Sequence, residues 1–279
     1  MSGREAAAFY TRYADWYDRI ASDTPLVGRL RERVVDALDP PRGDVVVEMG
    51  CGTGANLPLL RERVGPGGTV IGLDVSTGVL ARARERIDRA GWGNVHVARA
   101  DATRPPLRSG ASSRATAGAT GDEARDIDAV LATFLTGMLV DPAGAVDDWC
   151  RLVTADGSSD HPPAGRVCVA GLARSTHPIG RFLNPLFAAG VRTAAPPSGG
   201  TRTRRPTDEP AVERLDRRAL AAHRRVHERC PDAHTTRLFA GFARITTGSV
   251  IVTDTTDSEA DTDVDRNADA DTDATDGGR

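Results

Sequence analysis

The sequence predicts an α/β protein with a doubly wound, mostly parallel sheet that helices cover on both faces. Three observations support this fold class: strand and helix patterns alternate, the strands are apolar at consecutive positions, and a glycine-rich loop follows the first strand. Consecutive apolar residues are typical of strands that are buried on both faces of a sheet. The 279 residues, 39% of them apolar and 27% charged, suffice to bury a sizeable core in one large domain or two small ones.

The predicted elements follow a βαβ order along the chain. The first helix ends where Pro40 and Pro41 prevent its continuation, and the valine run at 45–47 then predicts a short buried strand. Segments 234–239 and 242–252 predict two strands joined at Gly241 as a closing hairpin. We expect further strands at 70–73, 95–98, 129–135 and 166–172, and helices at 26–38, 79–90, 141–153 and 211–229.

Composition divides the chain into three parts. We assign residues 1–29 to an N-terminal helical lid, 30–253 to the main domain and 254–279 to a disordered acidic tail. The Asp/Thr repetition of this tail cannot bury enough apolar surface to fold. Stretches rich in small, polar or Gly/Pro residues at 108–125, 158–164 and 194–210 predict flexible inserts in the main domain.

All three tyrosines of the chain lie in the first 29 residues. Tyr10, Tyr13 and Tyr17 share one face of a predicted helix, and Phe9 and Trp16 lie close beside that face. The concentration of scarce aromatic residues in one segment favours a lid. A terminal helix docked on the core is the alternative, and the sequence leaves both open.

Charge and cysteine usage exclude several classes of protein. All 36 basic residues are arginine and Asp outnumbers Glu by 29 to 10, a usage that resembles salt-adapted, GC-rich archaea. The net charge of −3 and the lack of aromatic residues among the arginines argue against nucleic acid as a partner. No apolar run reaches the roughly 18 residues of a membrane span. Four cysteines without a C-x-x-C pair, no signal peptide and no histidines at metal-ligand spacing predict a cytoplasmic protein without disulfides or metal.

The glycine-rich loop at 50–54 is the sharpest signal for function. Gly50, Gly52 and Gly54 let the backbone turn tightly and approach a ligand, with free amides near the positive end of the next helix. Gly50, Gly52 and Ala55 also satisfy the relaxed G-x-G-x-x-[GA] pattern of dinucleotide-binding proteins. The loop alone therefore predicts an anionic ligand group without choosing the ligand.

Three carboxylates at the ends of consecutive strands distinguish between ligands. Glu48 stands two positions before the first glycine, where it would repel a dinucleotide phosphate and attract a cationic group. Asp74 ends the next strand and can accept hydrogen bonds from both ribose hydroxyls. Asp101 follows the third strand and can accept a hydrogen bond from an exocyclic adenine amine. Together these acids predict a nucleoside that carries an amino acid.

At these residues the chain resembles the class I S-adenosylmethionine-dependent methyltransferases. The segment Glu48-Met49-Gly50-Cys51-Gly52-Thr53-Gly54 matches their E-x-G-x-G-x-G loop, and Leu73-Asp74-Val75-Ser76 and Ala100-Asp101-Ala102 match their next two motifs. The resemblance covers roughly residues 9–253 and is strongest to the ubiquinone/menaquinone-type and phospholipid-headgroup methyltransferases. It is specific for the cofactor and says far less about the methyl acceptor.

The resemblance implies a Rossmann-like sheet of seven strands, mostly parallel, with the hairpin as its antiparallel end. It implies S-adenosylmethionine as cofactor and S-adenosylhomocysteine as product. By the family's pattern, Glu48 and the loop amides hold the methionine part, Asp74 the ribose and Asp101 the adenine edge, although Asn56 and Ser76 fit equally well as ordinary helix-end residues. The residues assigned to the cofactor are Glu48, Gly50, Cys51, Gly52, Gly54, Asn56, Asp74, Val75, Ser76, Asp101, Ala102 and Thr133.

Two residues are candidates for catalysis. Tyr17, next to Asp18, matches the aromatic-Asp segment that closes over the cofactor in this branch of the family. His177 lies in the loop after the fifth predicted strand and is the histidine that we would test as a general base, with an ordinary loop histidine as the alternative. Methyl transfer is an in-line displacement, so positioning alone can supply about 7 to 11 kcal/mol and a dedicated base is not required.

The segment after Pro178 predicts an apolar helix that Pro185 would kink or split. A substrate cap or membrane-facing patch is one interpretation, and a core helix packed on the sheet is the other. Thr133-Phe134-Leu135-Thr136, after the fourth strand, contains no acidic or amide side chain, which favours an apolar acceptor. The apolar residues at helical spacing are Ile179, Phe182, Leu183, Leu186, Phe187 and Val191.

The preferred function is a methyltransferase that acts on a small or lipid-like acceptor, such as a quinone ring or a phospholipid headgroup. An oxidoreductase with a nicotinamide cofactor is the rival enzyme class, against which Glu48 and Asp101 argue. A catalytically silent, methyltransferase-like binding subunit is the non-enzymatic alternative, suggested by the missing acceptor motif.

Overall fold

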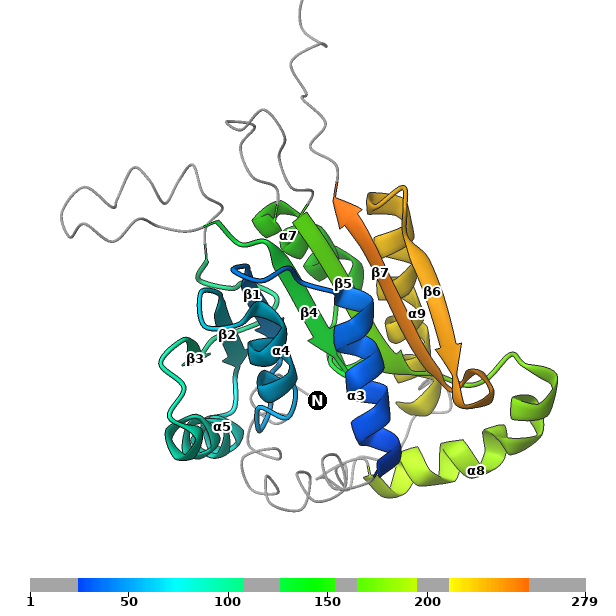
Figure 1. The fold of residues 1–279 in the computed structure, drawn as a ribbon. Helices are drawn as coiled ribbons and strands as arrows, with labels where there is room; N and C mark the ends of the chain where they lie inside the picture. The colour runs from blue at the N-terminus through cyan, green and yellow to red at the C-terminus, as the bar shows by residue number, and fades with distance from the viewer. Residues whose placement is uncertain (1–24, 108–125, 154–164, 195–210, 251–279) are drawn as a thin grey trace, which may run out of the picture.

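The computed structural model describes residues 25–107, 126–153, 165–194 and 211–250 (Figure 1). The aromatic cluster at 9–17, most of the predicted inserts and the acidic tail lie outside the described residues. The described part is built on one sheet of seven strands in the order β3-β2-β1-β4-β5-β7-β6. Five strands are parallel, and β7 runs antiparallel to both of its neighbours. The predicted mostly parallel sheet with a C-terminal antiparallel hairpin is therefore confirmed.

The strands lie close to the predicted positions. Their bounds are β1 Val45–Met49, β2 Thr69–Asp74, β3 Val95–Arg99, β4 Ala129–Thr133, β5 Gly165–Leu172, β6 His234–Leu238 and β7 Ala243–Val250. The 3-10 turn η2, Phe239–Gly241, joins the last two strands. Strand β4 ends at Thr133, two residues earlier than predicted, because Phe134 adopts a left-handed backbone conformation (φ 57°) that leaves the sheet.

Helices cover both faces of the sheet, as Figure 1 shows. Helices α3, α4 and α5 contribute to one apolar core, and α7 and α9 contribute to the other. The helix bounds are α3 Pro25–Leu38, α4 Leu57–Val64, α5 Thr77–Ala90, α7 Pro142–Val153, α8 Pro178–Ala194 and α9 Ala211–Arg229, with the 3-10 turn η1 at Thr136–Met138.

Strand β1 shows why consecutive apolar residues form the centre of this sheet. Successive side chains of a strand point to opposite faces, so Val45 and Val47 join one core while Val46 joins the other. All five residues of β1 are buried. The strand thus ends, at Glu48 and Met49, in a fully enclosed environment at the carboxyl edge of the sheet.

Of the kink or split predicted at Pro185 in α8, the split does not occur, because the helix runs unbroken from Pro178 to Ala194, and the kink stays a prediction. A proline inside a helix removes the bond that its amide would donate to the carbonyl of residue i−4, and its ring crowds that carbonyl. Residues Arg181 and Pro185 are both exposed, so water can reach the backbone there. The first half of the helix is exposed, unlike a core helix, and Figure 1 shows α8 beyond the carboxyl ends of the parallel strands and on neither face of the sheet.

Two further findings concern the composition of the described residues. None of their helices is long and apolar enough to pass through a bilayer. The four cysteines, Cys51, Cys150, Cys168 and Cys230, are all buried free thiols.

Candidate functional site

The glycine-rich loop leaves β1 through three residues with positive φ. Gly50, Gly52 and Gly54 have φ values of 68°, 56° and 75°, a region that side chains disfavour. A Cβ at Gly50 would lie 2.9 Å from Leu135 Cδ1, and one at Gly54 would lie 2.7 Å from Leu57 Cδ1. At Gly52 an added Cβ would meet nothing within 4 Å. The outer two glycines therefore allow packing, whereas the middle one faces open space that a ligand can enter.

Asp74 ties the end of β2 to this loop. Its Oδ2 accepts a hydrogen bond from the Gly52 amide at 3.0 Å, and its Oδ1 accepts one from the Ser76 amide at 2.8 Å. Burial raises the pKa of this carboxyl, while the hydrogen bonds from both amides oppose the rise. Each carboxylate oxygen retains a lone pair, so Asp74 can still accept hydrogen bonds from a ligand.

Glu48 is a fully buried carboxyl at the carboxyl end of β1. Its Oε1 accepts hydrogen bonds from Asn56 Nδ2 at 2.5 Å and from Thr133 Oγ1 at 3.3 Å. Its Oε2 has no hydrogen-bond partner among the residues that the structure describes. Burial raises the pKa of Glu48 to about 7. A buried acceptor without a donor is costly, so this oxygen is suited to a cationic ligand group.

Asn56 acts as a bridge rather than as a helix cap. It precedes α4 but makes no side-chain capping bond. Its Nδ2 donates to Glu48 and, at 2.8 Å, to Thr133 Oγ1. Asn56, Glu48 and Thr133 therefore form one buried polar group contributed by the loop, β1 and β4.

Arg31 is a residue of this site that sequence reasoning missed. It lies on α3, and its Nη1 donates to Asn56 Oδ1 at 2.8 Å. Its guanidinium carbon lies 5.9 Å from the centroid of the Phe134 ring, within the range of a cation–π contact. The positive charge of Arg31 also lowers the pKa of Glu48, against the effect of burial. Its position on an ordinary amphipathic helix gave no signal, because only packing brings α3 to the loop.

The adenine-side residues follow β2 and β3. Val75 is exposed and Ser76 is buried at the start of α5. Asp101 is exposed, and its Oδ1 accepts hydrogen bonds from the Thr103 amide at 2.9 Å and from Thr103 Oγ1 at 2.7 Å. Ala102 is buried, and its carbonyl accepts a hydrogen bond from Trp149 Nε1 at 2.8 Å. The large core residue of α7 thus fixes the turn that presents Asp101.

Cys51 contributes backbone to the site. Its amide donates to the Leu73 carbonyl at 2.9 Å, which joins the loop to β2. Burial, with the charges of Glu48 and Asp74, raises the pKa of the Cys51 thiol well above its usual value. The neutral, buried thiol is unsuited to act as a nucleophile.

The acceptor side is represented by the end of β4 and the loop after β5. Phe134 is held in its left-handed conformation by a hydrogen bond of 2.8 Å from its amide to the Ala170 carbonyl. His177 is exposed beside the hairpin, its Cβ lying 3.4 Å from where a Cβ at Gly241 would be. In the strand order, β7 is three strands from β1, so these contacts do not join His177 to the glycine loop. Tyr17 lies outside the described residues.

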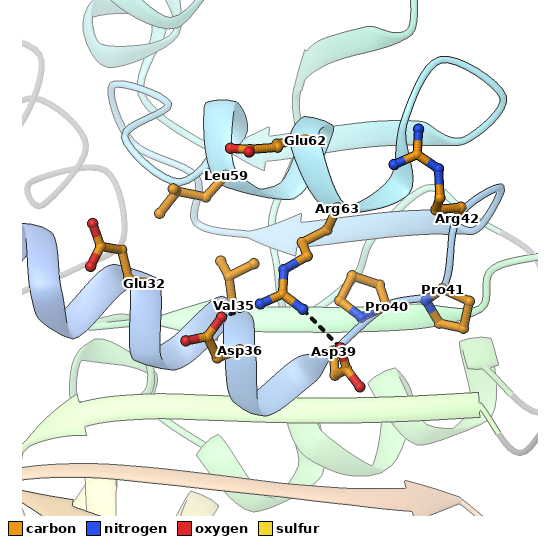
Figure 2. Close-up of a pocket in the computed structure, with 10 residues that line it drawn as sticks. All are labelled: Glu32, Val35, Asp36, Asp39, Pro40, Pro41, Arg42, Leu59, Glu62 and Arg63. Atoms are coloured by element: carbon orange, nitrogen blue, oxygen red, sulfur yellow. Dashed lines mark hydrogen bonds and ion pairs between the residues drawn. The ribbon is translucent and has the colours of Figure 1, made fainter.

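A pocket of about 640 Å³ lies elsewhere, between α3 and α4 at the opposite, amino edge of the sheet (Figure 2). Arg63 forms ion pairs there with Asp36 and, at 2.8 Å, with Asp39. None of its lining residues is one of the predicted cofactor residues. Among the described residues, no three His, Cys, Asp or Glu side chains gather closely enough to hold a metal ion.

Comparisons with known proteins point to one enzyme class. Residues 46–157 match the family model of a methyltransferase domain. Aklanonic acid methyltransferase from a Streptomyces species is 28% identical over 196 residues, which are 70% of this chain and 71% of that protein. A 2-phytyl-1,4-naphtoquinone methyltransferase from Thermosynechococcus vestitus is 39% identical over 83 residues, so the match spans 29% of this chain and 37% of that relative.

Solved structures show the same fold. The crystal structure of a SAM dependent methyltransferase from Aquifex aeolicus aligns with a TM-score of 0.51, covering 88% of this chain and 98% of its own. The two sequences are 15% identical over this alignment. At that identity the likeness concerns the arrangement of the elements and not the acceptor.

Proposed function

Because this chain is a class I S-adenosylmethionine-dependent methyltransferase, we propose that it methylates a small or lipid-like acceptor of the quinone or phospholipid-headgroup type in the cytoplasm. The observation that carries the cofactor assignment is Glu48, a buried carboxylate with an unpartnered oxygen, at the end of the strand from which the glycine loop with the open Gly52 leaves. A dinucleotide phosphate at this point would be repelled by Glu48, which argues against the nicotinamide alternative.

The residues of the site fit the parts of S-adenosylmethionine. Glu48 would accept a hydrogen bond from the ammonium group through Oε2, and the amides of the glycine loop would face the methionine part. Asp74 would hold the ribose hydroxyls, with Val75 and Ser76 following it. Asp101 Oδ2 has no hydrogen-bond partner among the described residues, so Asp101 can accept from the adenine amine, next to Ala102. When bound, S-adenosylmethionine supplies an electrophilic methyl group on a sulfonium.

The chain's own contribution to methyl transfer is positioning. A rigid site that holds the two reactants in the right orientation can lower the activation barrier by about 7 to 11 kcal/mol. This lowering does not require a general base. Glu48, Asn56, Thr133 and Arg31 are linked by hydrogen bonds across β1, the glycine loop, β4 and α3, so the methionine end of the site is preorganised. Tyr17 and His177 remain the candidates for contact with the acceptor or for removal of its proton.

The acceptor class is supported by what borders β4. Phe134 and Leu135 are apolar and partly exposed, and the buried polar atoms of Thr133 are engaged by Glu48 and Asn56. An acceptor with an apolar ring or chain, such as a quinone or a lipid, suits such a border better than a nucleic acid. The relative that is named for a naphtoquinone supports the same class.

Calorimetry with S-adenosylhomocysteine tests the cofactor assignment. We expect binding to the full chain, and Asp74→Ala should weaken it by a few kcal/mol because two ribose hydrogen bonds to a charged group are lost. NADH in place of the nucleoside should give no heat. Tight NADH binding, or no binding of the nucleoside to the intact protein, would refute the proposal, and turnover with any acceptor would exclude a purely silent subunit.

A further inference from the structure

Helix α8 exposes four large apolar side chains along one face. Ile179, Phe182, Leu183 and Leu186 are 65%, 87%, 46% and 72% exposed. Their spacing of three, four and seven residues places them in one stripe, which we call the α8 apolar face. An exposed stripe of this kind marks an interaction site.

The opposite side of α8 is fixed to the β6–β7 hairpin. Asn184 exchanges two hydrogen bonds with the backbone of Ser175, at 2.9 and 3.0 Å. Ser175 Oγ in turn donates to the Ala240 carbonyl in η2, and any side chain at Gly180 would collide with that same carbonyl. The helix is therefore held at its inner side, and the α8 apolar face is presented to solvent as part of the folded protein.

The surroundings of the face are cationic. No acidic residue occurs in 172–194 or in 233–250, although the chain has 39 acids. Arg181 and Arg237 are exposed and form no ion pair with any described residue, whereas Arg174 is paired with Asp216 at 3.2 Å. Phe239, at the tip of the hairpin, adds another exposed apolar side chain.

We propose that the α8 apolar face, together with Arg181 on the polar side of the same helix and Arg237 on the hairpin that α8 contacts, binds the surface of an anionic lipid bilayer. An amphipathic helix with basic residues and a face rich in Phe, Leu and Ile lies in the interfacial plane of a membrane and prefers anionic lipids. Helix α8 has basic residues and apolar Phe, Leu and Ile of this kind, and it contains no acidic residue. This proposed membrane contact does not depend on which acceptor the protein methylates.

Charge argues against a second copy of the chain as the occupant. A two-fold contact would bring together two copies of α8 and of the hairpin, each with Arg181 and Arg237 and neither with an acid. Anionic headgroups are complementary to the same arginines. The bilayer is therefore the partner that satisfies both the apolar and the charged part of the surface.

Vesicle co-sedimentation of the full chain tests the proposal. The wild type should bind vesicles of phosphatidylcholine with about one third phosphatidylglycerol, and should bind pure phosphatidylcholine about tenfold more weakly or less. Phe182→Asp should weaken binding to the anionic vesicles at least tenfold. Arg181→Gln should weaken it about fivefold at low salt and less at high salt.

Val140→Asp is the matched control, because Val140 is 81% exposed but lies outside the α8 apolar face. This variant should bind vesicles like the wild type, and Phe182→Asp should still bind S-adenosylhomocysteine normally. Equal vesicle binding by Phe182→Asp and wild type would overturn the proposal. A concentration-dependent dimer that Phe182→Asp abolishes, or a melting temperature that this variant alone lowers by several degrees, would also overturn it, since the face would then be covered by protein.

Discussion

Glu48 and His223 are both buried titratable side chains with one unpartnered atom, yet their surroundings differ. Oε2 of Glu48 and Nε2 of His223 each lack a hydrogen-bond partner among the described residues. Glu48 lies at the end of the strand from which the glycine loop leaves, and that loop is open at Gly52, whereas His223 Nε2 faces Gly171 inside the contact between α9 and β5. An unpartnered buried atom indicates a ligand site only where open backbone lies beside it.

The network around His223 supports a structural role. His223 Nδ1 and Thr246 Oγ1 are 2.8 Å apart, Thr246 Oγ1 and Thr235 Oγ1 are 2.6 Å apart, and Thr235 Oγ1 lies 2.8 Å from His227 Nε2. These side chains join α9 to β6 and β7. Burial and the nearby charges of Arg244 and His227 lower the pKa of His223 to about 4. His223 therefore stays neutral where Glu48 is half ionised.

The largest expected difference between the two regions is in cofactor affinity. Glu48→Gln keeps the shape of the side chain but removes its charge, so the affinity for S-adenosylhomocysteine should fall about 10- to 100-fold, as for the loss of a hydrogen bond to a charged group. His223→Gln should leave the affinity unchanged. Calorimetry on both variants measures the contrast, and equal losses would show that the two regions do not differ as we describe.

The second difference is in stability against acid. His223 has a folded pKa of about 4 against an ordinary 6.5, so the unfolded chain binds more protons between these values and stability falls as the pH drops. At pH 5 the loss is about 2 kcal/mol. The variant His223→Gln can keep a bond to Thr246 but has no imidazole to protonate. Its free energy of unfolding, measured with denaturant, should therefore fall by about 2 kcal/mol less than that of the wild type between pH 7 and pH 5.

Glu48 provides the opposite sign in the same experiment. Its folded pKa is raised from 4.5 to about 7, so the folded protein holds the extra proton and its stability rises as the pH drops through this range. The free energy of unfolding of the wild type minus that of Glu48→Gln should therefore rise as the pH drops. The corresponding difference for His223→Gln should fall. Slopes of the same sign would mean that one of the two carries its charge while buried.

The parts of the site that the sequence predicted are those set by local backbone. The three glycines and Asp74 follow from the turn that leaves β1 and from the end of β2, and both are local features. Arg31 could not be predicted because its contact with Asn56 depends on how α3 packs across the sheet. The left-handed conformation of Phe134 could not be predicted either, because phenylalanine normally favours strands.

For the fold, too, the sequence predicted the local elements but not the features that depend on packing. Strand and helix positions, with the closing hairpin, followed from sequence patterns, and the place of this hairpin as the antiparallel end of a seven-stranded sheet followed from the family resemblance. The exposure of α8 could not be decided, because an apolar stripe looks alike whether it faces the sheet or solvent. The bonds of Asn184 with Ser175 and the close approach of Gly180 to the Ala240 carbonyl determine which side of the helix is held.

The smallest expected effect is the pH dependence of cofactor affinity close to neutrality. Glu48 must lose its proton before it can accept a hydrogen bond from the ligand ammonium group through a charged oxygen. With a pKa of about 7 in the free protein, the association constant for S-adenosylhomocysteine should fall about tenfold per pH unit below 7 and level off above it. Calorimetry between pH 5.5 and pH 8 should show this dependence in the wild type and in His223→Gln but not in Glu48→Gln. A wild type whose affinity does not change over this range would mean that the ligand does not reach Glu48, and that Oε2 is unpartnered for the same structural reason as His223 Nε2.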